Sequence, residues 1–135
     1  MKRAPSILAI LAAPLALAAC AATLQTVDAP PASAYTPLSM PDRVFDTEDQ
    51  VIDYYLARAN TADADIEREI GRDGSGLGAR MIVVTTDGYQ DDSVLGEQWR
   101  IVLGEANNGF RVLQAGIRYN CARGANPGWS RDLCP

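Results

Sequence analysis

Residues 93–121 decide the fold, and their sequence is SVLGEQWRIVLGEANNGFRVLQAGIRYNC. Apolar and polar residues alternate on both sides of the central Asn-Asn-Gly, which predicts two strands that each have one buried face. The apolar positions are Leu95, Trp99, Ile101 and Leu103 in the first strand and Leu113, Ala115, Ile117, Tyr119 and Cys121 in the second. The stretch therefore predicts a long antiparallel hairpin, closed at Asn107-Asn108-Gly109.

The two arms also predict how the hairpin turns. A two-residue Asn108-Gly109 loop would place Leu103 opposite Gln114, so that an apolar side chain would face a polar one. A three-residue loop that ends in a left-handed Gly109 matches the apolar faces, and we expect that loop. The pairs that follow from it are Leu103 with Leu113, Ile101 with Ala115, Trp99 with Ile117, Leu95 with Cys121, Glu105 with Arg111 and Gln98 with Arg118.

A helix is expected before the hairpin. Thr47-Glu48-Asp49-Gln50 has the spacing of a capping box, with two acidic residues in the first turn. Apolar residues then recur at intervals of three and four, namely Ile52, Tyr55, Ala59, Ala62, Ile66 and Ile70. This stripe predicts one helix from about Glu48 to Ile70, ended by Gly71. A break near Asn60-Thr61, where Thr61 could cap a second helical segment, is the alternative.

Between helix and hairpin, residues 80–86 read RMIVVTT, which predicts a strand that is covered on both faces. The expected fold class is therefore α+β, with one N-terminal helix packed on a three-stranded antiparallel sheet. After Cys121 the chain shows no periodicity, and we expect a C-terminal loop tied by a disulfide.

The N-terminal residues predict a lipoprotein signal peptide. Lys2 and Arg3 precede an apolar run, Ile7 to Ala19, which is too short for a permanent transmembrane helix. The four residues that end in Cys20 resemble the lipobox of bacterial lipoproteins, in which the cysteine is lipidated and becomes the new N-terminus. An ordinary signal peptide cut near Ala32-Ser33-Ala34 is the alternative.

The expected domain organisation follows from this signal. Residues 1–19 form the signal peptide, residues 20–45 a lipidated Cys20 with a disordered Pro/Ala-rich tether, and residues 46–135 the small α+β domain. Ala21 follows the lipidated cysteine, whereas retention in the inner membrane commonly uses aspartate there. We therefore expect a lipid anchor in the outer membrane, with the domain on the periplasmic face.

The cysteine count agrees with lipidation. Three cysteines leave one over in an oxidising compartment, so lipid on Cys20 would leave Cys121 and Cys134 as a pair. Their bridge would close a loop of about fourteen residues, worth about 3 kcal/mol. The alternative is two free buried thiols.

Charge and composition exclude several classes of function. Without Lys2 and Arg3, ten arginines face seventeen acidic residues, a net charge of −7. This balance does not suit nucleic-acid binding. The sequence has no histidine, which removes the usual general base and most zinc sites, and we expect no cofactor, no bound metal and no catalytic residue.

Two groups of charged residues still suggest sites. Asp87, Asp91, Asp92 and Glu97 lie close in sequence and make a calcium site conceivable, but their spacing is not that of an EF-hand, and acids that cap their own turn fit better. The arginines could form an anion-binding face or simply pair with the acidic helix and across strands. They are Arg111, Arg118, Arg123 and Arg131. Trp129 could stack on a sugar, but we expect it, with Leu133, to fill the core beneath the disulfide.

The last third of the chain, about residues 88–135, resembles an uncharacterised family of small secreted or lipid-anchored bacterial proteins. The matching segments are Asp91-Asp92-Ser93-Val94, Gly96-Glu97-Gln98, Phe110-Arg111-Val112, Ala115-Gly116, Cys121-x-x-Gly124, Trp129-Ser130 and Cys134-Pro135. The resemblance implies a disulfide between Cys121 and Cys134. That family usually carries Gly-Arg-Gly-His before the tryptophan, where this chain has residues 124–128, GANPG, so an activity that rests on that arginine and histidine does not carry over.

Two functions are compatible with these features. The first is a non-enzymatic outer-membrane lipoprotein whose periplasmic domain binds an envelope partner, either a protein or a glycan. The second is a carboxylate-based or calcium-dependent hydrolase that acts on envelope glycans. The two differ in one structural feature, because a hydrolase needs two carboxylates that converge in one pocket.

Overall fold

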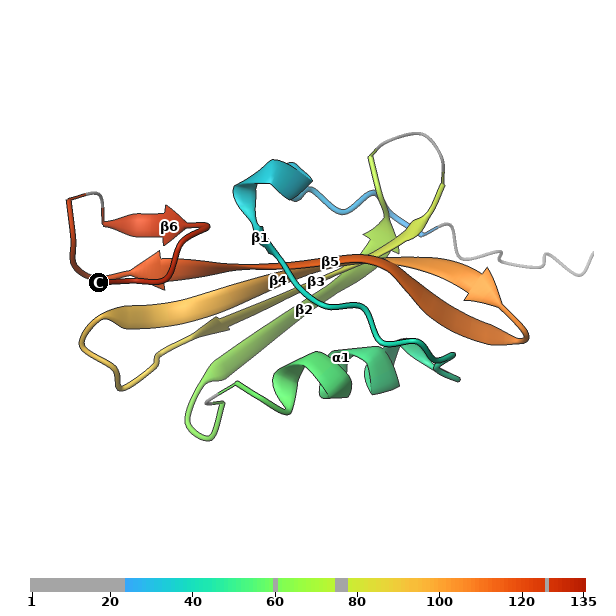
Figure 1. Cartoon of the computed structure of the whole chain (residues 1–135), viewed down its shortest axis with the longest axis horizontal. Coiled ribbons are helices and arrows are strands. Elements are labelled where there is room, and N and C mark those ends of the chain that lie inside the picture. The colour runs from blue at the N-terminus through green and yellow to red at the C-terminus, as the bar shows by residue number, and fades with distance from the viewer. Residues whose placement is uncertain (1–23, 60, 75–77, 126) are drawn as a thin grey trace, which may run out of the picture.

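The structure is a computed structural model that describes residues 24–59, 61–74, 78–125 and 127–135. One antiparallel sheet dominates it, with the strand order β1-β5-β4-β3-β2 and with β6 also paired to β5 (Figure 1). In chain order the elements are a 3-10 helix at Ala32–Ala34, β1 at Thr36–Pro37, α1 at Glu48–Leu56, β2 at Asp65–Arg72, β3 at Arg80–Asp87, β4 at Val94–Ala106, β5 at Gly109–Cys121 and β6 at Gly128–Ser130.

The sheet is covered on both faces. Helix α1 lies along one face, where its buried residues Val51, Ile52 and Tyr55 join a core that includes Ile82 and Ile101. Residues 24–35 cross the other face (Figure 1), where Val27 packs against Met81 and Val83 of β3. Strand β3 is therefore buried on both sides, as residues 80–86 predict.

The expected helix on a three-stranded sheet is wrong, because the chain is mostly β. Helix α1 begins at Glu48 as expected, and Thr47 caps it by accepting a hydrogen bond from Gln50 N (3.3 Å). It ends at Leu56, however, and residues 65–72 form β2. The prediction of a helix through Ile66 and Ile70 was wrong because a spacing of four residues fits one face of a helix and equally one face of a strand.

The hairpin of β4 and β5 is confirmed, but its turn is not the one expected. Trp99 pairs with Ile117 and Ile101 with Ala115, as predicted. Asn107 and Asn108, both with positive φ, form a two-residue turn, and Ala106 pairs with Gly109. Two irregularities then restore the apolar faces: Leu103 pairs with Val112, which leaves Leu113 as an extra exposed residue, and Cys121 pairs with Val94, which leaves Leu95 extra and exposed.

Most of the expected tether belongs to the fold. Residues 24–45 include three buried side chains, those of Val27, Tyr35 and Phe45. Phe45 exchanges two backbone hydrogen bonds with Phe110 (2.8 and 2.7 Å). Gly109 permits this approach, because a Cβ there would lie 2.2 Å from Phe45 O. Residues 1–23, with the expected signal peptide and Cys20, lie outside the described chain.

The disulfide between Cys121 and Cys134 is confirmed, with 5.4 Å between the two Cα atoms. The prediction that Trp129 and Leu133 fill a core beneath the disulfide is wrong. Trp129 is 41% exposed and Leu133 is 71% exposed. Trp129 lies on β6 and stacks against the guanidinium of Arg118, whose Cζ is 4.5 Å from the ring centroid.

Candidate functional site

A pocket of about 190 Å³ opens between the C-terminal half of α1 and the sheet. A cavity of about 150 Å³ can hold one benzene ring, so this pocket accepts a group of similar size. Its walls are largely aromatic and aliphatic, and they carry one carboxylate and one guanidinium. The main lining residues are Leu38, Tyr54, Tyr55, Arg58, Glu97 and Trp99.

Two consecutive tyrosines of α1 form one wall. The rings of Tyr54 and Tyr55 are perpendicular, with centroids 5.1 Å apart. Tyr55 Oη donates to the carbonyl oxygen of Ser39 (3.2 Å), which ties the helix to the segment before it. Burial raises the pKa of Tyr55 to about 12, so its hydroxyl stays a donor at neutral pH.

Glu97 of β4 supplies the carboxylate. Regular pairing between β3 and β4 ends at Thr85 and Gln98, and one residue further the Thr86 hydroxyl accepts a hydrogen bond from Glu97 N (3.0 Å). Tyr89, in the turn after β3, donates its hydroxyl to Glu97 Oε2 (2.7 Å). The Thr86 hydroxyl in turn lies 3.0 Å from Tyr89 Oη, so the three side chains form one connected group.

The surroundings of Glu97 disfavour its charge. Burial raises the pKa of Glu97, and the hydrogen bond from Tyr89 opposes this only in part. Tyr119, directly opposite on β5, has its pKa raised first by burial and then by the negative charge of Glu97. Among the described residues, no arginine forms an ion pair with Glu97, and no donor reaches its Oε1.

The other acids that made a calcium site conceivable do not line this pocket. Asp91 accepts hydrogen bonds from Ser93 N (2.7 Å) and Val94 N (3.1 Å), and these bonds lower the pKa of Asp91. This confirms that an acid of the turn caps its own backbone. Asp87 accepts from Gly88 N, and the carboxylate of Asp92 pairs with Arg123. Within the described ranges, no group of three acidic or cysteine side chains could hold a metal ion.

Each of the four arginines considered for an anion-binding face has a partner within the protein. Arg111 pairs with Asp42 (3.2 Å), Arg123 with Asp92, and Arg131 donates to Ser33 O (3.3 Å). Arg118 donates to Gln98 Oε1 (2.9 Å), opposite it on β4 as predicted, whereas the predicted pair of Glu105 and Arg111 is wrong because Arg111 lies opposite Gly104. Anion binding by these residues stays a prediction.

The hydrolase hypothesis asks whether two carboxylates converge. Among the described residues, no second carboxyl group lines the pocket of Glu97. Asp28 and Asp73 line one hollow together, but it lies on the opposite face of the sheet, beside Val27 and Met81, and Asp28 is exposed. In the described part of the chain, Glu97 and a second carboxylate therefore do not converge in one pocket.

One sequence signal could have located this site. Alternation along β4 places Glu97 on the same face as Trp99, Ile101 and Leu103, and a charged residue on a buried face calls for an explanation. Its partners Thr86 and Tyr89 carry no comparable signal, because their contact with Glu97 depends on how the β3–β4 turn closes.

Comparisons of the chain with protein-family models, curated proteins and solved structures found no match. The resemblance noted for residues 88–135 stays a prediction. In the described part of the chain, no helix is both long and apolar enough to cross a membrane.

Proposed function

We propose that the protein is a non-enzymatic outer-membrane lipoprotein, anchored through Cys20, whose periplasmic domain binds an amine-bearing envelope partner in the Glu97 pocket. The ligand group is an ammonium on a short aliphatic chain. A small amine could supply it, and so could a lysine side chain of a protein.

The half-buried carboxylate of Glu97 carries this proposal. Its raised pKa means that its charge costs folding stability, and a glutamine could accept the hydrogen bond of Tyr89 without that cost. A residue that lowers stability in this way is typical of a functional site. Because Oε1 receives no donor from the described residues, an incoming N–H group can bind there.

The walls of the pocket fit the same ligand. Tyr54, Tyr55 and Trp99 present aromatic surfaces, which attract cations as well as aliphatic chains. Arg58 lines the pocket too and is exposed, which favours ligands that carry an anionic group near the amine. The absence of a second carboxyl group among the lining residues supports binding rather than hydrolysis.

The proposed anchor rests on the lipobox and on the cysteine count. The sequence has three cysteines, and the bridge uses Cys121 and Cys134, so Cys20 is left over for lipidation. We expect Cys20→Ser to abolish incorporation of a labelled fatty acid and to leave an uncleaved precursor. Normal processing of that variant would contradict the anchor.

The ligand is tested with n-butylammonium, which also reproduces the end of a lysine side chain, and with neutral butan-1-ol as the matched probe. NMR titration of the mature chain should show binding of the cation with shifts at Trp99 and Tyr55. Glu97→Gln should weaken it roughly tenfold or more, the loss expected for about 1.4 kcal/mol of charge interaction. Glu105→Gln, an exposed change on the same strand, should leave it unaffected.

The pH dependence gives a second readout. Protonation of Glu97 removes the negative charge, so affinity for the cation should rise with pH through the raised pKa of Glu97 and then level off. Equal binding of the alcohol and the cation, or equal binding by Glu97→Gln, would contradict the proposal.

A further inference from the structure

Strand β2 is an edge strand of the sheet, and most of its outer side is open in the part of the chain that the structure describes. It pairs with β3 along its whole length, from Asp65 opposite Asp87 to Arg72 opposite Arg80. On the outer side of β2, the described residues 25–27 form backbone hydrogen bonds with Arg72. Arg72 N donates to Gln25 O (2.8 Å), and Val27 N donates to Arg72 O (3.0 Å). The remainder of that side has no backbone partner among the described residues.

The outward backbone groups can be identified by alternation. In a strand, the N–H and C=O of one residue point to the same side, and those of the next residue point to the other. Because Arg72 bonds outward, Ile66, Arg68 and Ile70 also direct their N–H and C=O groups outward. The edge thus offers three donors and three acceptors over about 13 Å of strand.

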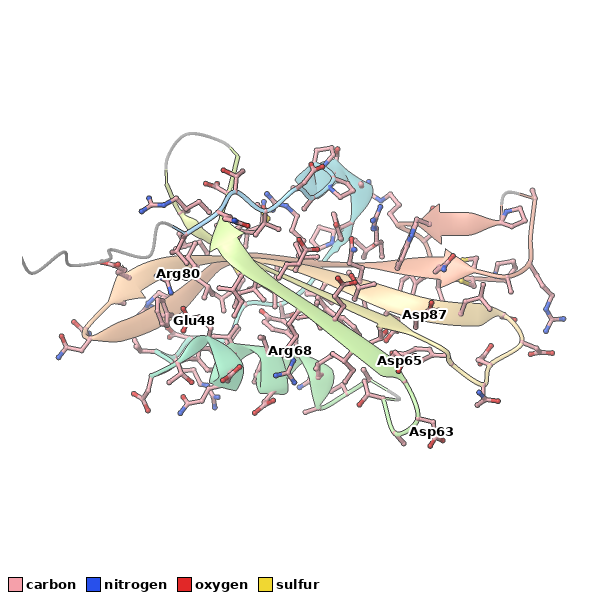
Figure 2. All side chains as sticks on the ribbon, turned by 180° about the vertical axis from the view of Figure 1, so that it is seen from behind. Glu48, Asp63, Asp65, Arg68, Arg80 and Asp87 are labelled. Atoms are coloured by element: carbon pink, nitrogen blue, oxygen red, sulfur yellow. A yellow bond between two sulfur atoms is a disulfide. The ribbon has the colours of Figure 1, made fainter. Side chains whose placement is uncertain are left out.

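The side chains of β2 give this edge two different faces. Ile66 and Ile70, 39% and 38% exposed, lie on the α1 side together with Arg68, which reaches Asp49 of α1 (3.7 Å). The opposite face carries Asp65, Glu67 and Glu69, all exposed and none in an ion pair with a described residue. Figure 2 shows Asp65 near Asp63 and Asp87, so the acidic face continues around the start of the strand.

This charge pattern disfavours a second copy of the chain. If two β2 strands paired antiparallel about Arg68 with both α1 helices on one side, Glu67 of each copy would stand opposite Glu69 of the other. Like charges directly opposite each other destabilise a strand pair. Residues 21–24 of the same chain, Ala-Ala-Thr-Leu, could extend along the edge, but they carry no positive charge to offset the acids.

We propose that the outer edge of β2 binds an extended segment of a basic protein partner, in which apolar residues alternate with lysine or arginine. The segment adds a strand to the sheet, with its apolar side chains beside Ile66 and Ile70 and its basic ones beside Glu67 and Glu69. This site is separate from the Glu97 pocket and does not depend on it.

The test uses the mature chain and a blocked octapeptide in which valine and arginine alternate. Hydrogen exchange should slow at Ile66, Arg68 and Ile70 when the peptide binds, and the affinity should fall as salt rises. The same protection is expected in Glu97→Gln, which separates this site from the pocket. A peptide of alternating valine and glutamate, and the first peptide with N-methylated backbone amides, should both fail to bind.

Variants of β2 separate charge from backbone. Glu67→Lys with Glu69→Lys should weaken the peptide roughly tenfold or more, whereas Asp28→Lys with Asp132→Lys changes net charge equally and should have a small effect. Arg68→Pro removes one outward donor without touching the bonds to β3 and should weaken binding, while Arg68→Ala should not.

Three outcomes would overturn the proposal. Binding that survives N-methylation of the peptide would exclude strand addition. Protection of the β2 edge without peptide, rising with protein concentration, would identify a second copy as the occupant. Protection that is independent of concentration, and is lost when Ala22 is replaced by proline, would identify the chain's own N-terminal segment.

Discussion

Replacement of Tyr89 by phenylalanine tests directly whether the Tyr89 hydroxyl stabilises the charge of Glu97. The Tyr89 hydroxyl donates to Glu97 Oε2 over 2.7 Å and is the side-chain donor that opposes the raised pKa of Glu97. A hydrogen bond to a charged acceptor contributes about 1.5–3 kcal/mol, and a neutral one about 0.5–1.5 kcal/mol. Since Glu97 is partly exposed and water can replace the donor, we expect Tyr89→Phe to cost about 1.5–2 kcal/mol at neutral pH.

The cost should depend on pH. The folded pKa of Glu97 lies above its unfolded value, so its favourable contribution is complete below the unfolded pKa and is lost as pH rises through the folded one. Loss of the Tyr89 hydrogen bond raises the folded pKa further. The variant should therefore lose more stability relative to wild type at about pH 7 than at about pH 4, because low pH favours the protonated form of Glu97.

Urea denaturation, followed by the fluorescence of buried Trp99, measures the stability cost of Tyr89→Phe at each of the two pH values. In a Glu97→Gln background the pH dependence of the Tyr89→Phe cost should disappear. Tyr119→Phe is the matched control, because that hydroxyl lies near Glu97 without a hydrogen bond to it. An equal cost of Tyr89→Phe at both pH values would refute the view that partial burial disfavours the charge of Glu97 and that the Tyr89 hydroxyl stabilises it.

Two further predictions concern stability alone. Gly109→Ala should cost about 2 kcal/mol or more in urea denaturation, because its Cβ would lie 2.2 Å from Phe45 O and force two backbone segments apart; an unchanged midpoint would mean that this contact does not form. Cys121→Ser with Cys134→Ser should cost about 3 kcal/mol, whereas Trp129→Ala should cost about 1 kcal/mol, far less than a core aromatic, because that ring is 41% exposed. Equal losses for these two changes would place the tryptophan in the core after all.

Local patterns predicted those elements that local chemistry determines. The capping residue Thr47 gives the first residue of α1 correctly, and the apolar run of 80–86 gives β3. Alternation gives the pairs of β4 and β5 at their centre, including Trp99 with Ile117. Alternation gives the wrong pairs near the turn, because Leu113 is an extra residue at a β-bulge. The sequence of one strand does not reveal where such a bulge lies.

Long-range packing decided the remainder. β2 exists because β3 needs a partner on its free side, and the Ile66–Ile70 spacing alone could not separate strand from helix. Tyr35 looked like part of a tether among prolines, yet it is 2% exposed and donates to Gln98 across the sheet (2.6 Å). The alternation along β4 predicts that Glu97 lies on the inner face, but nothing in the sequence predicts that Tyr89 is its hydrogen-bond partner.

The packing of the chain from Leu24 onward limits the distance between the domain and a lipid on Cys20. Three residues separate Leu24 from Cys20, so a lipid on Cys20 would hold the domain within about 14 Å of the bilayer surface. Gln25 bonds to Arg72 at one end of β2, while Thr86, which contacts Glu97, lies opposite Ile66, about 20 Å further along the strand. With the anchor proposed above, the Arg72 end of β2 would lie nearer to the lipid than the Glu97 pocket, and a partner would have to bind close to the membrane surface.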